Sequence, residues 1–130
     1  MITLVGRWEN GWLDYRVEYF MWKQLAAAYG VNRIAMVGQS NESRIPIDQY
    51  DSMEEALVSC TGDLVFIEPK GEVSLVDYDH PGDVVYVFGN AMNDNLKHAG
   101  TTVRIDTPNP TDVFALNAAS IILAHRYEHR

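Results

Sequence analysis

The stretch from Asp83 to Arg130 decides the predicted fold; it reads DVVYVFGN, AMNDNLKHAG, TTVRIDTPNP and TDVFALNAASIILAHRYEHR. Val84 to Phe88 form a continuous β-branched and aromatic run, which is typical of a strand buried on both faces. A second such run, Thr101 to Ile105, follows a short predicted helix and is closed by prolines. A long apolar helix is predicted over 111–127. Strands and helices alternating in this order predict parallel strands and an α/β domain.

The rest of the chain continues the alternation. Residues 2–6, 32–37 and 63–68 are predicted strands, 15–29 and about 51–60 are predicted helices, and 38–50 is a predicted polar loop. Gly30 directly follows the first helix, at a position where a left-handed glycine often ends a helix. Together these segments predict one α/β domain over residues 1–130, with a mostly parallel sheet of about five strands.

Composition narrows the class of protein. The chain is 47% apolar and 22% charged, as globular domains are. No apolar run approaches the roughly 20 residues of a membrane span, and the N-terminus lacks the pattern of a secretory signal. Cys60 is the only cysteine, which excludes an intrachain disulfide and a cysteine-based zinc site, and it is predicted to be a buried, inert thiol. The four histidines lack metal-ligand spacing, so no metal is expected. These absences predict a cytoplasmic protein.

The charge argues against strong binding of nucleic acid by one copy of the chain. The formal net charge is −8, and the ten lysines and arginines form no cluster. Contacts to phosphate supply most of the affinity for nucleic acid. RNA binding would therefore need a groove between two subunits, or a partner protein.

In open parallel sheets, ligands bind outside the carboxyl ends of the strands. Here two of those ends are Phe88-Gly89-Asn90 and Ile105-Asp106-Thr107, so a site is expected there. The final helix is apolar nearly all round from Val113 to Ala124, which predicts burial on more than one side, one of them against another subunit. Asn117 is its polar exception, and it either caps a backbone group or faces a ligand.

Several segments, in this order, resemble SpoU-type members of the SPOUT methyltransferase superfamily. They are Gln39, Arg44–Ile47, Ile67–Glu68, His80–Asn90, Arg104–Thr107 and Ala115–Ala119. The family signatures they resemble are a strand ending in FGxE, a strand ending in IPT or IPM, and a final helix that starts with SLN or CxN. The similarity runs from about Ala26 to the C-terminus, roughly four-fifths of the chain.

The resemblance implies a deep trefoil knot formed by about residues 83–130. It implies S-adenosylmethionine held largely by backbone groups of three loops, Ile67–Glu68, Phe88–Met92 and Ile105–Asn117. The cofactor-binding residues would be Ile67, Glu68, Phe88, Gly89, Ile105, Thr107, Ala115, Leu116 and Asn117. It further implies a homodimer packed through the C-terminal helix, and methylation of a ribose 2′-hydroxyl of transfer or ribosomal RNA.

The chain also departs from the family pattern. Gln24 stands where the family has an arginine that is thought to assist deprotonation of the ribose hydroxyl, a general-base task. Ala91 replaces the glutamate, Asp106 the proline and Ala115 the serine. The candidates for the substrate side are therefore Arg16, Lys23, Asn90 and Asn117.

Three functions remain open from the sequence. One is an RNA methyltransferase with a divergent catalytic set, in which proximity to the methyl donor supplies much of the rate. Another is a knotted homodimer that has lost methyl transfer but still binds the cofactor or a partner. The third is a nucleotide-binding or hydrolytic α/β protein of another kind.

Overall fold

The computed structural model of this chain describes residues 1–9, 14–38, 47–89, 100–109 and 113–129. The strands are β1 (Ile2–Arg7), β2 (Arg33–Val37), β3 (Asp48–Tyr50), β4 (Asp63–Ile67), β5 (Val73–Ser74), β6 (Val84–Phe88) and β7 (Thr101–Arg104). The α-helices are α1 (Tyr15–Tyr29), α2 (Met53–Val58) and α3 (Ala115–Glu128), and a 3-10 turn, η1, covers Leu75–Asp77.

The strands form one sheet in the order β3-β2-β1-β6-β4-β7-β5, and every described pairing is parallel. The predicted α/β class with a mostly parallel sheet is confirmed. The predicted number of about five strands is wrong, because the sheet has seven. Both missed strands are short edge strands. β3 lies in the segment predicted as a loop and pairs with β2, and β5 has two residues and pairs with β7.

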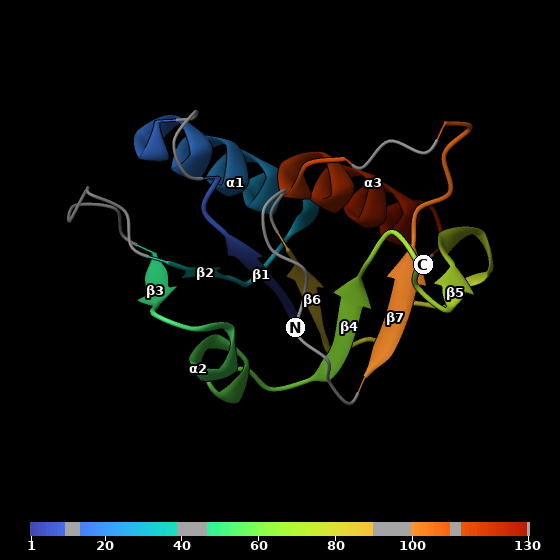
Figure 1. The fold of residues 1–130 in the computed structure, drawn as a ribbon, viewed down its shortest axis with the longest axis horizontal. Helices are drawn as coiled ribbons and strands as arrows, with labels where there is room; N and C mark the ends of the chain where they lie inside the picture. Colours follow the sequence, from blue (N-terminus) through green and yellow to red (C-terminus); the bar gives the residue numbers. More distant parts are fainter. Residues whose placement is uncertain (10–13, 39–46, 90–99, 110–112, 130) are drawn as a thin grey trace.

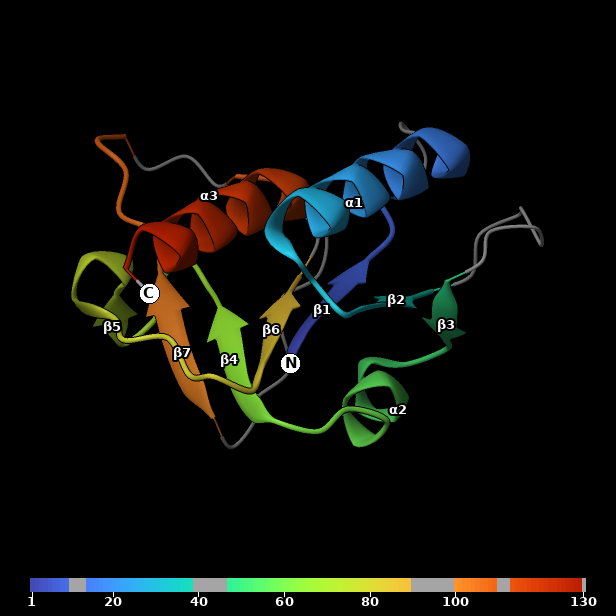
Figure 2. The same cartoon turned by 180° about the vertical axis from the view of Figure 1, so that it is seen from behind.

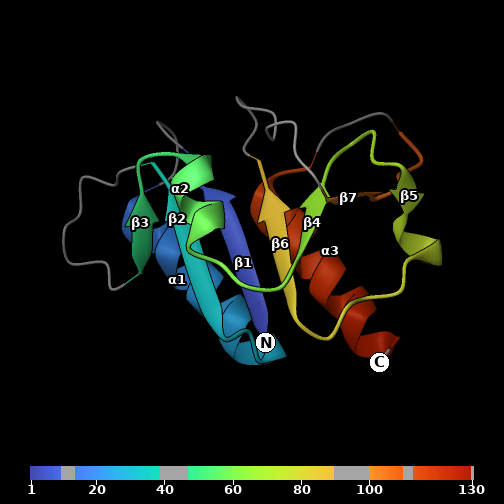
Figure 3. The same ribbon diagram turned by 90° about the horizontal axis from the view of Figure 1, so that it is seen from below.

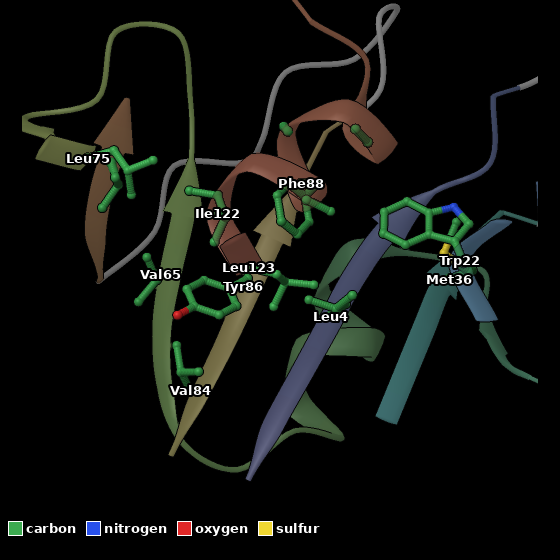
Figure 4. Close-up of a cluster of buried hydrophobic side chains, with 14 of the residues drawn as sticks. Leu4, Trp22, Met36, Val65, Leu75, Val84, Tyr86, Phe88, Ile122 and Leu123 are labelled. Atoms are coloured by element: carbon green, nitrogen blue, oxygen red, sulfur yellow. The ribbon is translucent and has the colours of Figure 1, made fainter. Parts of the chain in front are cut away.

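Helices cover both faces of the sheet. α1 and α3 lie side by side on one face (Figures 1 and 2), and α2 lies on the other (Figure 3). Side chains alternate along each strand, so the sheet has a core on either side. Tyr86 and Phe88 of β6 meet Ile122 of α3 in the larger core (Figure 4), whereas Val85 and Val87 belong to the smaller core beside α2. β6 is buried at all five positions, as its apolar run predicts.

The first helix has the predicted bounds. Asp14 is its N-cap, and the side chain of Asp14 accepts a hydrogen bond from the backbone N–H of Arg16. Gly30 follows with φ of 69°, and its N–H donates to the carbonyl of Ala26. The predicted glycine stop is therefore confirmed. In α2, Ser52 is the N-cap, and its hydroxyl accepts from the N–H of Glu55.

The last helix differs from its prediction. It begins at Ala115 rather than at residue 111, with Phe114 as the N-cap residue. Burial on more than one side is not seen in the single chain. Ala118, Ala119, Ile122 and Leu123 are buried, while Ile121 is 39% and Phe114 43% exposed. One apolar side of α3 faces the core and another faces outward.

The chain crosses over β7 between β4 and β5. β7 lies between these two strands in the sheet, although it follows both in the sequence. The segment 68–72 must therefore pass from one side of β7 to the other. Gly71 passes very close to β7, because a Cβ there would lie 2.5 Å from the backbone carbon of Val103. Only glycine fits at such a close backbone approach.

Two further features concern the described residues alone. None of the helices in the described parts of the chain combines the length and the apolar character that a membrane crossing requires. Nor do three or more His, Cys, Asp or Glu side chains come together there in an arrangement that would hold a metal ion.

Candidate functional site at the carboxyl edge of the sheet

Three predicted ligand-binding turns start next to one another. Ile67 at the end of β4 pairs with Phe88 of β6 on one side and with Val103 of β7 on the other. The backbone N–H of Glu68 donates to the carbonyl of Val103 over 3.0 Å. Because all three strands are parallel, the turns that follow them leave from the same edge. Glu68, Gly89 and Ile105 thus lie at one place in the fold.

Both long helices begin near this edge. Parallel strands require their crossover helices to run back, so α1 and α3 start at the carboxyl edge and end at the amino edge. At the amino edge the rings of Tyr29 and Tyr127 are 6.5 Å apart. Phe114, the N-cap residue of α3, supplies no side-chain hydrogen bond. The first N–H groups of α3, at residues 115–117, therefore lack a side-chain cap and remain suited to anionic or carbonyl oxygens.

The turn after β7 is held by a polar clamp. The Ser74 hydroxyl donates to one carboxylate oxygen of Asp106 at 2.5 Å, and Arg104 Nε donates to the other at 3.0 Å. Arg104 Nη1 also donates to the carbonyls of Gly71 and Glu72. The hydrogen bonds from Ser74 and Arg104 lower the pKa of Asp106. Asp106 is thus an ionised structural group that ties the turn to the crossing segment.

The end of β1 borders the same place. Val5 of β1 pairs with Val87 of β6, and the same register brings Arg7 level with Gly89. Arg7 is partly buried, and its Nε is shielded from solvent without a hydrogen-bond partner. Its continuous register with Val37 of β2 fixes its backbone. The sequence did not single out Arg7, and the only signal was its position at the end of a predicted strand.

A buried carboxylate anchors the segment after β1. Glu18 of α1 is fully buried, and it accepts hydrogen bonds from the N–H of Glu9 at 3.0 Å and from Trp22 Nε1 at 3.1 Å. Burial is the main cause that raises the pKa of Glu18. Trp8 is held as well, by an edge-on ring contact with Tyr15. These contacts of Trp8 and Glu9 therefore fix the backbone that directly follows Arg7.

The four predicted substrate-side residues do not all gather at the edge. Asn117, in the first turn of α3, is exposed, so it is not a buried amide. Arg16 is exposed on α1 and pairs with Asp14. Lys23 lines a hollow of about 300 Å³ between α1 and the β2–β3 side of the sheet. Asn90 lies outside the described residues.

The residues predicted to bind the cofactor differ in how far they are buried. The structure describes nine of them, Ile67, Glu68, Phe88, Gly89, Ile105, Thr107, Ala115, Leu116 and Asn117. Phe88 and Ala115 are buried, Thr107 and Asn117 are exposed, and the others are partly buried. Of the three loops, residues 90–92 and 110–112 lie outside the described part.

A second polar cluster lies at the opposite, amino edge. His80 Nδ1 lies 2.6 Å from the Tyr86 hydroxyl, and His80 Nε2 lies 2.8 Å from His125 Nδ1. Arg126 donates to the same Tyr86 oxygen and to the carbonyl of Pro81. Burial first, and then the neighbouring positive groups, lower the pKa of His80 to about 4. These side chains join the end of α3 to the segment before β6.

Cys60 is only partly buried, in contrast to the predicted buried thiol. Its Sγ donates to the carbonyl of Ala56 and accepts a hydrogen bond from Arg33 Nη1 at 3.4 Å. Arg33 also bonds Asp48 and the hydroxyl of Tyr50. This arginine therefore ties β2 to β3 and to the end of α2, at the side of the sheet away from the three turns.

Comparison with models of protein families and with curated proteins gave no match. Solved structures do match. One, from a study of 2-OH methylation of C/U34 on tRNA, has a TM-score of 0.72 and 17% sequence identity and covers 98% of this chain and 95% of its own. The SpoU methyltransferase AviRb from Streptomyces viridochromogenes, in complex with AdoMet, has a TM-score of 0.70 and 17% identity over 98% of this chain.

The chain has the fold of SpoU RNA methyltransferases. An RNA 2′-O ribose methyltransferase is a third similar structure, with a TM-score of 0.73, 16% identity and coverage of this whole chain. The chain spans 59% of AviRb and 56% of that third protein. The SpoU fold expected from the sequence resemblance is confirmed over nearly the full chain. At these identities the likeness carries no residue roles.

Proposed function

We propose that this protein is an S-adenosylmethionine-dependent RNA methyltransferase that modifies a ribose 2′-hydroxyl. The observation that carries the proposal is the meeting of three turns, after Ile67, Phe88 and Arg104, at one edge of a sheet with the SpoU fold. A structural relative with the same fold binds AdoMet, and two others concern 2′-hydroxyl or ribose methylation of RNA.

The residues at this edge suit the cofactor. Gly89 has no side chain beyond Cα and directly follows β6 at this edge, and the first turn of α3, which Phe114 does not cap, offers N–H groups at residues 115–117. The turns at Glu68 and Ile105 complete the cradle, which would hold the cofactor mainly through backbone groups. When bound, S-adenosylmethionine supplies an activated methyl group on its sulfonium. The chain would contribute orientation of the ribose and exclusion of water.

We also propose that the chain closes the trefoil knot implied by the resemblance. Its support is the crossing of 68–72 over β7 together with the view in Figure 3, in which α3 lies within the outline of the loop that runs from β4 through β5 to β6. The contacts of Arg126 with the carbonyls of Pro81 and Gly82 lie on the returning part of that loop. Such threading is rare in proteins and would hold the turns together without a large core.

We further propose a homodimer through the C-terminal helix. Ile121 of α3, and Val113 and Phe114 just before the helix, are each about 40% exposed, and together they offer apolar surface to another helix. Val17, Phe20 and Met21 form a similar exposed stripe on α1, on the same face of the sheet. A dimer would also provide the groove that a chain of net charge −8 needs for RNA.

Two measurements test the function in sequence. Calorimetry with S-adenosylmethionine is expected to show one site per chain, and no binding would refute the proposal. Incorporation of labelled methyl groups into total RNA is then expected, with the label lost from the ribose 2′-position when a 2′-deoxy substrate is used. Cofactor binding without methyl transfer to any RNA would identify a binding module instead.

A further inference from the structure

The guanidinium of Arg7 carries a charge that no contact among the described residues balances. Its Nε is shielded from water and has no hydrogen-bond partner, and Arg7 has no ion pair within the described parts of the chain. Withdrawing a charged donor from water without a partner is costly. Such a group calls for an explanation, and a ligand that completes its hydrogen bonds supplies one.

The other arginines of the described residues are already engaged. Arg33 donates to Asp48, Arg104 to Asp106, and Arg126 to main-chain carbonyls. Arg16 pairs with the N-cap carboxylate of its own helix. Each of these four therefore has a structural partner, and Arg7 is left as the arginine available to a ligand.

The position of Arg7 indicates what that ligand is. β1 is the neighbour of β6 on the side away from β4 and β7, so Arg7 borders the three turns instead of standing among them. A group at this border is placed to meet the substrate more readily than the cofactor. Alternation along β1 puts Arg7 on the same face as Val5, the face that α2 also covers.

The backbone that carries Arg7 is held on both sides. Gly6 precedes it in the sheet, where a Cβ would lie 3.3 Å from the ring of Trp22. Trp8 follows it, 1% exposed, with its Nε1 donating to Gln49 and its N–H to the carbonyl of Val37. The buried carboxylate of Glu18 then fixes the N–H of Glu9. A side chain on so rigid a base is suited to orient a ligand.

We propose that Arg7 binds a phosphate of the RNA substrate at the rim of the cofactor turns. This inference rests on the proposed function. A guanidinium offers several N–H donors to one phosphate, and a protein of net charge −8 must place its cations where RNA meets it. Arg7 thereby supplies at the site an attraction that the overall charge of the chain does not.

Arg7→Gln tests the inference, with Arg126→Gln as the control that removes the same charge at the opposite edge. Binding of fluorescein-labelled bulk tRNA is measured by anisotropy over a series of salt concentrations. Arg7→Gln is expected to weaken binding by about tenfold at low salt and to reduce the slope of log K against log[salt] by about 0.7–0.9, the value for one phosphate. Arg126→Gln is expected to leave that slope unchanged.

Two further readouts exclude a merely structural role. Affinity for S-adenosylmethionine is expected to stay within twofold in Arg7→Gln, and its melting temperature is expected to be unchanged or higher, because an unpaired, partly buried charge has been removed. Arg7→Lys should retain the salt slope with weaker binding. In methyl transfer, the loss should appear in KM for RNA more than in kcat.

The outcomes separate this inference from the function on which it rests. An unchanged tRNA affinity and salt slope in Arg7→Gln overturns the inference while the methyltransferase stands. Loss of cofactor affinity in place of tRNA affinity also overturns it, because Arg7 then binds the carboxylate of the cofactor. A wild-type protein that binds no S-adenosylmethionine refutes the function itself.

Discussion

Replacement of Gly71 by alanine probes the crossing on which the candidate site depends. An added Cβ would lie 2.5 Å from the carbonyl carbon of Val103, 2.7 Å from the N of Arg104 and 2.8 Å from the N of Val103. All three atoms belong to the backbone of β7, so no side-chain rotation relieves the clash. The crossing segment must lift away from β7, or β7 must shift within the sheet.

The cost follows from the hydrogen bonds that join the two segments. Arg104 Nη1 donates to the carbonyls of Gly71 at 3.0 Å and Glu72 at 3.2 Å, and the N–H of Glu72 donates to the Thr102 hydroxyl at 2.8 Å. At roughly 1 kcal/mol for each bond, their loss destabilises the fold by about 3 kcal/mol. That is a large part of the 5–15 kcal/mol that typically stabilises a domain.

Urea unfolding and thermal melting of Gly71→Ala measure this cost. The expected result is a loss of about 3 kcal/mol and a fall in melting temperature on the order of 10 °C. S-adenosylmethionine affinity should fall as well, because Glu68 and Ile105 flank the crossing. Gly82→Ala is the matched control, since a Cβ there meets no atom within 4 Å. A Gly71→Ala protein as stable as Gly82→Ala would show that the segment does not press on β7.

Three other predictions address the pocket, the dimer and the amino edge. Gly89→Val should reduce cofactor affinity by at least tenfold, because it adds a branched side chain directly after β6, where the three turns meet; unchanged calorimetry would count against the placement. Ile121→Asp should convert the proposed dimer to monomers in sedimentation, since it would bury an unpaired charge, whereas Val58→Asp on the 86% exposed position of α2 should not; a persistent Ile121→Asp dimer refutes the proposed interface. Because His80 is held neutral with a pKa of about 4, its contribution to stability is present above about pH 6.5 and is lost as the pH falls towards 4. Partial exposure reduces that loss to on the order of 2 kcal/mol, and His80→Gln should flatten this part of the pH profile; an identical profile would contradict the assignment.

The strands and helices that the sequence predicted are those with strong local signals. Val84–Phe88 is apolar at every position and became the fully buried central strand. The helix Tyr15–Tyr29 has a capping aspartate before it and a glycine after it. β3 and β5 have no such signal, because two- and three-residue edge strands are defined by the neighbours they pair with, and not by their own side chains.

The sequence predicted where in the fold the candidate site lies, but not which side chains surround it. The parallel direction of the strands follows from the alternating pattern, so the turns after Phe88 and Ile105 could be assigned to one edge of the sheet from sequence. The side chains that surround this edge could not be predicted in the same way. Lys23, predicted for the substrate side, instead lines a hollow on the β2–β3 side of the sheet. Arg7 could be singled out only from the structure, because the structure shows which of the other arginines have hydrogen-bond partners.

The turn after β7 does not need a proline to be stiff. A proline stiffens a turn by fixing one backbone dihedral. Here the turn is held from outside, because Asp106 accepts hydrogen bonds from Ser74 of β5 and Arg104 of β7. Arg104 in turn bonds the carbonyl of Gly71, where the chain crosses β7. One ionised carboxylate thereby joins the edge strand, the crossing and the turn. Asp106 therefore fixes this turn without a proline, and it does so at the edge where the proposed cofactor cradle lies.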